Sequence, residues 1–318
     1  MKTLRAYAEL IRLPNAFTAA ADAVAGSWLA CAWQIGAAPA DGRSPWETVV
    51  GWPRLAWLIV ASVCLYSAGI VLNDLRDLDA DRRERPTRPL PSGCVTVGTA
   101  CLFAAALAVL GILAAAFAGS TSATHLEFTA TNHGLLVALA LVAAIALYDL
   151  VLKETPLGPL AMGLCRALNL ALPLAATGVL ILEAHVAALA AMFVYVASFT
   201  HFGREEVGPR SRARLWLGTI GITVGLFLLG PVAMWNPSNS PATFVLWLAL
   251  LVHMARVGWR AARQPAPATV QYAMKTFILG IVVLDAVLAC AVGGPVAGGI
   301  VLALLIPPLA IGRRLYST

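Results

Sequence analysis

The feature that most restricts the fold of this chain is a series of apolar runs, each about as long as a lipid bilayer is thick. A helix needs about 20 mostly apolar residues to cross the hydrocarbon core of a membrane. The candidate runs are 14–35, 53–73, 95–118, 132–151, 157–180, 184–201, 214–234, 242–262, 273–293 and 296–312. They lack the period-two alternation of membrane strands, so they predict an all-α bundle with nine to ten transmembrane spans.

The composition agrees with lipid as the main solvent of the chain. Hydrophobic residues make up 60% of the 318 residues and charged residues only 12%, which is about half the charged share of a soluble domain. Because a bundle of spanning helices folds as one unit, residues 1–318 are expected to form a single integral membrane domain. The net charge of +6 does not indicate nucleic-acid binding, since the basic residues lie in short loops between the apolar runs.

The basic residues also indicate the side of the membrane on which each loop lies. Cytoplasmic loops are enriched in Lys and Arg. If the N-terminus is cytoplasmic and the chain crosses ten times, every basic residue except Arg43 and Arg54 lies on the cytoplasmic side. With nine spans, either the last run would not cross or Arg313 and Arg314 would lie outside. We therefore prefer ten spans in the cell membrane, preceded by a short amphipathic surface helix at the N-terminus.

A cluster of aspartates follows the second apolar run, on the predicted cytoplasmic side. Asp74, Asp77 and Asp81 are spaced i, i+3 and i+7, so they share one face of a helix, while Asp79 points away. Three carboxylates on one face repel one another unless a cation joins them. Their oxygens suit a hard divalent ion such as Mg²⁺, which keeps positions open for substrate phosphates.

Arginines accompany these aspartates. Arg82, Arg85 and Arg88 follow within the same segment, and the guanidinium group matches the geometry of phosphate oxygens. A solvated basic loop would explain the arginines but not four aspartates at a position where the charge rule requires none. Charge at a membrane helix end that faces a bundle is usually a functional site.

The segment 73–93 resembles the first aspartate-rich motif of the UbiA superfamily of intramembrane prenyltransferases. That motif reads N-D-x-x-D-x-x-x-D and is followed by R-P-x-R-P-[LI]-x-S-G. The chain matches it at Asn73, Asp74, Asp77, Asp81, Arg85, Pro86, Arg88, Pro89, Leu90, Ser92 and Gly93.

The resemblance implies a Mg²⁺-dependent transferase that moves a prenyl group from a prenyl diphosphate to an aromatic or other lipophilic acceptor. It implies that Asp74, Asp77 and Asp81 are catalytic and bind the metal. It also implies that Asn73, Arg85 and Arg88 bind the substrate.

Two further predicted cytoplasmic segments are expected to contribute if the resemblance holds. Tyr148 lies at the end of the fourth run and Lys153 follows that run, and the two residues are similar to the family's substrate-binding pattern. Arg166 and Asn169 are spaced i, i+3 at the cytoplasmic end of the fifth run, where a charge is costly unless it faces a cavity or a partner. We expect Arg166 to be catalytic and Asn169 to bind substrate. For Lys153 and Arg166 the alternative is snorkelling to the membrane interface.

The chain departs from the family's second aspartate-rich motif, between the sixth and seventh spans. Residues 201–210 contain no aspartate. Glu205 and Glu206 are adjacent and about 100° apart on a helix, so they cannot aim at one ion as an i, i+4 pair would. We expect Glu206 to be catalytic, and Glu205, Arg204 and Arg210 to bind substrate. The sequence does not determine whether one or two Mg²⁺ ions bind. This variant is similar to the EboC-like branch of the superfamily.

The alternative is that the protein has the same fold but does not catalyse prenyl transfer. The missing second motif is compatible with a protein that binds or transports an isoprenoid lipid. The prenyl chain length, the acceptor and the oligomeric state do not follow from the sequence. Asp22 and Asp285 lie within apolar runs, and we expect both to be structural.

Overall fold

The computed structural model describes residues 2–32, 44–120, 132–178, 183–204, 211–235, 238 and 240–311. Every regular element in this part of the chain is helical, which confirms the all-α prediction. The elements are α1 (Lys2–Leu10), α2 (Leu13–Cys31), α3 (Pro45–Val49), α4 (Gly51–Arg76), α5 (Leu78–Glu84), α6 (Val97–Ser120), α7 (His133–Leu147), the π-helical turn η2 (Tyr148–Leu152), α8 (Gly158–Ala176), α9 (Glu183–Gly203), α10 (Arg212–Leu228), α11 (Gly230–Trp235), α12 (Pro241–Arg263), α13 (Pro267–Ala303) and α14 (Ile306–Ile311).

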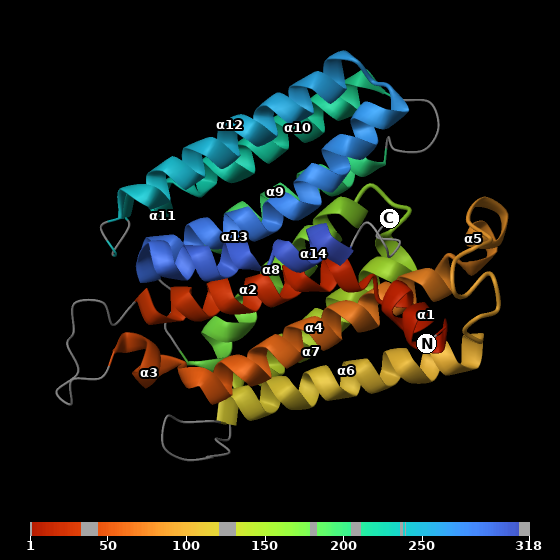
Figure 1. Cartoon of the computed structure of the whole chain (residues 1–318), viewed down its shortest axis with the longest axis horizontal. Coiled ribbons are helices and arrows are strands. Elements are labelled where there is room, and N and C mark those ends of the chain that lie inside the picture. The colour runs from red at the N-terminus through yellow and green to blue at the C-terminus, as the bar shows by residue number, and fades with distance from the viewer. Residues whose placement is uncertain are drawn as a thin grey trace.

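The long helices run side by side in one bundle, with α1 and α5 at one end and α3 and α11 at the other (Figure 1). Among the described residues, eight helices are long and apolar enough to cross a membrane. They begin with α4 and end with the stretch Pro267–Ala310. The protein is therefore a multi-pass membrane protein.

Two elements decide whether further spans are added to these eight. Helix α2 has 19 residues and packs between α4, α8 and α13, but Asn15 and Asp22 make it more polar than the others. In α13 the backbone leaves helical geometry at Gly294, with φ 74° and ψ −171°. These angles are essentially restricted to glycine.

The chain reverses direction at this glycine. A Cβ atom on Gly298 would lie 2.8 Å from Cβ of Cys290 and 3.1 Å from the carbonyl oxygen of Ala286. The arm after Gly294 therefore runs back along the arm before it, and α14 packs against α2. The two arms correspond to the runs 273–293 and 296–312, while ten crossings of the membrane remain a prediction.

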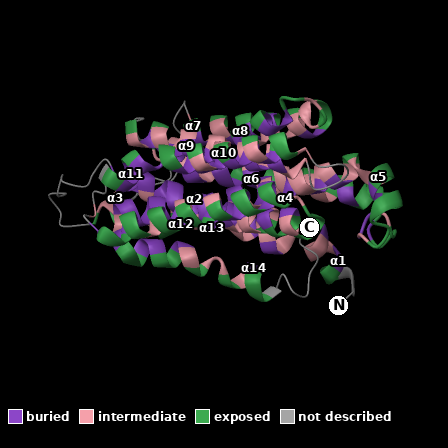
Figure 2. Ribbon diagram, turned by 90° about the horizontal axis from the view of Figure 1, so that it is seen from above, coloured by how far each residue is buried: buried purple, intermediate pink, exposed green. Residues whose placement is uncertain are grey.

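The outer surface of the bundle is apolar, as lipid contact requires. Exposed side chains on the outer helices include Leu102 at 73%, Phe227 at 67% and Val245 at 65%. Figure 2 shows exposed faces on the outside of the bundle and buried residues in its interior. Helices of this type bury their small residues against one another and leave their large apolar side chains to the lipid.

Candidate active site

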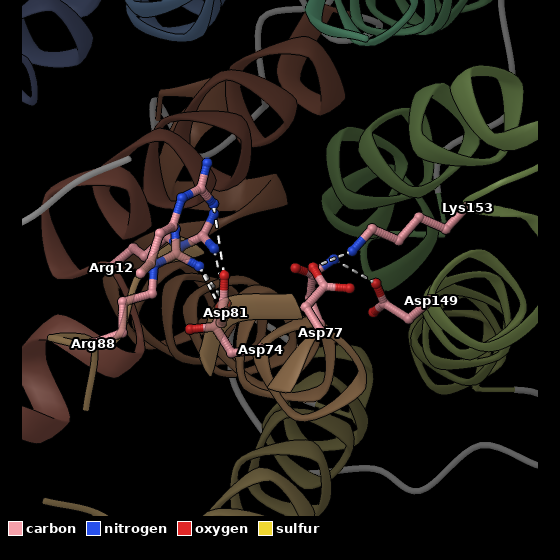
Figure 3. Close-up of polar contacts among 9 residues, drawn as sticks. Arg12, Asp74, Asp77, Asp81, Arg88, Asp149 and Lys153 are labelled. Carbon is pink, nitrogen blue, oxygen red and sulfur yellow. Dashed lines mark hydrogen bonds and ion pairs between the residues drawn. The ribbon is translucent and has the colours of Figure 1, made fainter. Parts of the chain in front are cut away.

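The aspartate cluster lies where one helix ends and another begins. Helix α4 ends at Arg76, and Asp77 takes φ −87° and ψ 3° before α5 starts at Leu78. This break changes the prediction that three aspartates share one face. In the structure Asp74 and Asp81 lie together, whereas Asp77 turns toward η2 (Figure 3).

Arginines hold the first two carboxylates. Arg12 donates from Nη2 to Oδ1 of Asp74 at 2.8 Å, and Arg88 donates from Nη1 to Oδ2 of Asp81 at 2.7 Å. The same Nη1 lies 3.7 Å from Oδ1 of Asp74, so Arg88 bridges the pair. Arg85 lies farther out, 3.9 Å from Asp81. The side chains of Asp74, Asp81 and Arg88 are almost fully buried, at 7%, 6% and 10% exposure.

A lysine holds the third carboxylate. Nζ of Lys153 is ion-paired with Oδ2 of Asp77. Asp149 lies beside them (Figure 3) and accepts a hydrogen bond from Nδ2 of Asn73 at 2.9 Å. The helix α4 and the turn η2 thus place two carboxylates and one ammonium group together. A π-helical turn inside a helix is frequently found at a functional site.

These groups surround the mouth of a cavity of about 350 Å³. We call Arg12, Asp77, Arg85, Arg88 and Lys153, which all line it, the charged mouth. Beyond the charged mouth the walls become largely apolar. The lining side chains there include those of Ile70, Leu141, Ile145 and Met162. A charged entrance above an apolar chamber suits an amphiphilic ligand with an anionic head and a hydrocarbon tail.

The inner end of the cavity is polar again. Nε of Arg166 lies 2.8 Å from Oδ2 of Asp22, and Nδ2 of Asn169 donates to the same oxygen at 2.6 Å. Oγ of Ser62 donates to Oδ1 of Asn169 at 2.9 Å. Arg166 and Asn169 therefore lie where the cavity ends, with Asp22 behind them, instead of at the charged mouth. Asp285 is fully buried next to Asp22.

The remaining predicted site residues fall into three groups. Tyr148 lines the cavity, and its binding of substrate stays a prediction. Arg204 donates from Nη2 to the carbonyl oxygen of Lys153 at 2.9 Å and also to that of Thr155. It therefore supports the turn that carries Lys153 and does not line this cavity. The predicted residues Glu205, Glu206 and Arg210 lie outside the described residues.

Sequence reasoning missed Arg12 and Asp149 as site residues. Arg12 was counted only as a cytoplasmic charge, yet it has the left-handed backbone conformation, with φ 48° and ψ 55°. A residue other than glycine held in this conformation is often part of a functional site. Asp149 is 4% exposed at the end of an apolar run, and a buried charge in that position was the available signal.

The carboxylates at the mouth fit Mg²⁺ in their chemistry. Within the described ranges, no three Asp, Glu, His or Cys side chains form a group that could hold a metal. Mg²⁺ in phosphate-transfer sites is usually held by one or two carboxylates, waters and the substrate phosphates. Asp77, which is 30% exposed and lines the cavity, is the carboxylate best placed to share such an ion with a substrate.

Several curated proteins are similar to part of this chain. Digeranylgeranylglyceryl phosphate synthase from Methanocaldococcus jannaschii is 33% identical over 117 residues, which cover 37% of this chain. The match spans about a third to a half of the length of the curated relatives, at 36% of the Methanocaldococcus jannaschii protein and 49% of the one from Metallosphaera sedula. These partial matches show that the chain is similar to these synthases, but they do not identify its substrates.

Solved structures share the fold over a longer range. A structure of a digeranylgeranylglyceryl phosphate synthase is 19% identical, with a TM-score of 0.61 over 92% of this chain and 100% of that one. The apo structure of a UbiA homolog from Aeropyrum pernix K1 is 17% identical, with a TM-score of 0.56 over 84% of this chain and 96% of that one. The pattern of the UbiA prenyltransferase family matches residues 27–281, which is most of the chain. The chain therefore belongs to the UbiA prenyltransferase family.

Proposed function

We propose that this protein transfers a prenyl group from a prenyl diphosphate to a lipophilic acceptor inside the membrane, with Mg²⁺ as its metal. The observation that carries this proposal is the cavity, which combines a charged mouth with apolar walls. A prenyl diphosphate has the same division into a highly charged head and a hydrocarbon tail. Family membership supports the same class of reaction.

The charged mouth supplies the groups that bind the diphosphate. Arg12, Arg88 and Lys153 each neutralise an aspartate in the structure described here. A guanidinium group binds phosphate oxygens in a bidentate manner, and an ammonium group binds them as a point charge. We expect these cations to share their contacts between the aspartates and the diphosphate once it is bound.

The same groups favour departure of the diphosphate. When bound, Mg²⁺ neutralises negative charge that develops on the leaving group. Asp77 holds Lys153 at the mouth through their ion pair. Arg88 and Lys153 stabilise the negative charge that develops on the diphosphate. Apolar walls formed by residues such as Leu141 and Ile145 exclude water, which protects an allylic cation until the acceptor attacks.

The decisive experiment measures diphosphate release by purified protein in nanodiscs, with a panel of lipid-soluble acceptors. The assay is run with and without Mg²⁺, on the wild type, on Asp77→Ala and on Asp79→Ala. Asp79 is the matched control, because its side chain is 88% exposed and points away from the cavity. We expect Mg²⁺-dependent release that is lost in Asp77→Ala and kept in Asp79→Ala.

Binding without turnover is the second candidate function. It is favoured by residues 201–210, which contain no aspartate and so lack the second motif of the family. A prenyl diphosphate that binds in the presence of Mg²⁺, but is never cleaved with any acceptor, would point to an isoprenoid-binding or transport protein. Full activity of Asp77→Ala would refute the assignment of this aspartate.

A further inference from the structure

We propose that the inner end of the cavity binds the acceptor, through a neutral oxygen that accepts a hydrogen bond from Arg166. The polar layer at this end consists of Asp22, Arg166, Asn169 and Asp285, from α2, α8 and α13. This inference rests on the proposed function, because it concerns the second substrate of the same reaction. It adds the class of that substrate, which is a compact, uncharged ring compound with a carbonyl or similar oxygen.

Arg166 has hydrogen-bond donors that the protein does not use. Its Nε pairs with Oδ2 of Asp22 at 2.8 Å, and its Cζ lies 5.9 Å from the ring centre of Tyr66. Among the described residues, its Nη2 has no hydrogen-bond partner. The side chain lines the cavity and is 9% exposed. Because a guanidinium group carries five N–H donors, this one keeps donors for a ligand at the cavity wall.

An unsatisfied donor is costly inside a membrane bundle. Water is scarce there to replace a missing partner, and a buried polar group without a partner destabilises the fold. The neighbouring Asn169 is already engaged, since it donates to Asp22 at 2.6 Å and accepts from Ser62 at 2.9 Å. A ligand oxygen placed against Arg166 would satisfy the donors that these contacts leave over.

The charges of the polar layer select a neutral group. Asp22 neutralises Arg166, and Asp285 is a second carboxyl group beside Asp22. Both carboxyl groups are fully buried. With Asp285 protonated the layer has no net charge, and with Asp285 ionised it is negative. In neither state does a positive charge remain to pair with a carboxylate or phosphate on the acceptor, and an uncompensated buried charge is strongly destabilising.

A prenyl tail meets apolar surface nearer to the charged mouth. Gly69 and Ile145 line both the cavity and an apolar groove along α4, α6 and α7. Gly69 lies about one helical turn closer to the mouth than Tyr66. Hydrocarbon gains free energy against apolar walls, whereas against the polar layer it would cover groups that need hydrogen bonds. The tail therefore leaves the polar layer to the other substrate.

The distance between the mouth and the polar layer suits a compact acceptor. Asn73 and Tyr66 both line the cavity and are seven residues apart on α4, which is about 10 Å at a rise of 1.5 Å per residue. The rings of Tyr66 and Tyr148 line the same space, and a flat ring packs well against aromatic side chains. A ring compound anchored at Arg166 turns its other edge toward the diphosphate end of the donor.

The test uses three naphthalenes that carry different groups at the same ring position: acetonaphthone, ethylnaphthalene and naphthoate. Equilibrium dialysis measures their binding to the full-length protein in nanodiscs, and empty nanodiscs give the partition into lipid. Mg²⁺ and inorganic diphosphate are present throughout, so that the charged mouth is filled and does not bind naphthoate. We expect acetonaphthone to bind at least tenfold more tightly than each of the other two probes, because it alone offers a neutral oxygen.

Two variants separate the effect of the donor from the effect of charge. Asp22→Asn keeps an oxygen for Arg166 and makes the polar layer more positive, so naphthoate should improve at least tenfold relative to acetonaphthone. Asp22→Asn combined with Arg166→Met removes the guanidinium donors and both charges of the pair. In this double variant the preference for acetonaphthone over ethylnaphthalene should fall at least tenfold.

The control variant is Leu172→Ala. Leu172 is fully buried on α8 and does not line the cavity, so this change makes a void in the same helix and should keep the wild-type preferences. Each variant is compared with the wild type as a ratio between two probes, so that partition into lipid cancels. The order of the three probes on the wild type decides the question if a variant does not fold.

A separate titration with geranyl diphosphate and Mg²⁺ distinguishes the two proposals. Wild-type protein that binds naphthoate as tightly as acetonaphthone, or that binds none of the three probes, would overturn the acceptor assignment. A preference for acetonaphthone that survives in the double variant would overturn it as well. In these cases binding of geranyl diphosphate leaves the proposed function intact, whereas failure of the wild type to bind geranyl diphosphate would overturn the proposed function itself.

Discussion

At the scale of single residues, Asp77 organises the site because it is the point where α4 stops. With ψ near 3° it redirects the chain, so that its own carboxylate meets Lys153 while Asp74 and Asp81 meet arginines. The three aspartates of one motif thereby serve two different sets of cations. Neither Arg12 nor Lys153 belongs to the aspartate segment, and both are more than sixty positions away from their partners along the sequence.

Arg12 is expected to bind the diphosphate although it lies before the first long helix. Arg12→Gln should weaken binding of a prenyl diphosphate about ten- to a hundredfold, because hydrogen bonds to charged groups contribute about 1.5–3 kcal/mol. Binding to protein in nanodiscs measures this. Arg82→Gln is the control, since Arg82 is 58% exposed and pairs with Asp79. Equal losses in both variants would argue for a general effect of charge and against a specific contact.

Asp149 is expected to tune the competition between Lys153 and the metal. Asp149→Asn removes a negative charge beside Lys153 while an oxygen remains to accept from Asn73. Lys153 would then hold Asp77 more strongly, and the Mg²⁺ concentration for half-maximal donor binding should rise about three- to tenfold. Titration with Mg²⁺ at a fixed donor concentration measures this shift. The same titration on Asp79→Asn should match the wild type, and an unshifted Asp149→Asn would contradict the prediction.

At the scale of elements, the contact between α2 and α8 holds the inner end of the cavity. It depends on Gly26, because its missing side chain lets the backbone of α2 approach Leu170 and Pro173. Close approach at small residues is the common way in which membrane helices pack, since lipid offers no hydrophobic force to drive them together. The contacts of Asp22 with Arg166 and Asn169 lie directly above this point and depend on the same spacing of the two helices.

Gly26→Ala is therefore expected to destabilise the protein by about 1–3 kcal/mol, as overpacking does in a well-packed core. Thermal unfolding in one detergent, followed by intrinsic fluorescence, measures the change. Gly98→Ala is the matched control, because a Cβ atom there meets nothing within 4 Å and alanine favours the helix by roughly 0.5–1 kcal/mol. If Gly26→Ala leaves the melting temperature unchanged, α2 and α8 can move apart at a small cost in free energy, which would contradict the prediction.

At the scale of the whole molecule, the bundle has two different ends. The aspartate segment, α1 and the turn after η2 lie at the same end (Figure 1). The charge rule predicts that this end is cytoplasmic. The substrate mouth would then open toward the compartment in which soluble diphosphates are made, while the outer faces of α6 and α7 meet lipid.

Cys94 provides a direct test of this orientation. It is exposed in the segment between α5 and α6, whereas Cys31, Cys64, Cys165 and Cys290 are buried. Cys101 is also exposed, but it lies on an apolar helix where lipid prevents formation of the reactive thiolate. An impermeant maleimide should label inside-out vesicles and not right-side-out vesicles, and Cys94→Ser should abolish the label. Labelling of right-side-out vesicles alone would invert the topology.

Much of the fold could be predicted from local pattern. The runs 132–151 and 242–262 agree closely with the helices His133–Leu152 and Pro241–Arg263, because lipid requires about 20 apolar residues for each crossing. The amphipathic helix at the N-terminus is also present as α1. The run 214–234 is less regular than expected, since it divides into α10 and α11 near Leu229.

The candidate site followed from the sequence only in part. The spacing of Asp74, Asp77 and Asp81, with the arginines after them, was sufficient to indicate an anion and metal site, because these residues are close in the chain. Their grouping on one face was wrong, since a helix break at a single residue leaves no mark in the spacing. Nothing local could show that Asp22 would hold Asn169, which is 147 positions away.

The sequence by itself determined the helical class, the membrane as solvent, the family motif and the end at which charge collects, because each depends on residues within a few turns of one another. Only the tertiary structure decided which cation meets which carboxylate, where Arg12 and Asp149 enter the site, and how deep the cavity is. Those properties depend on how α2, α4, α8 and the turn η2 pack together. The physical reason is that a buried charge is stabilised by partners in space, and helix packing brings together partners from distant parts of the chain.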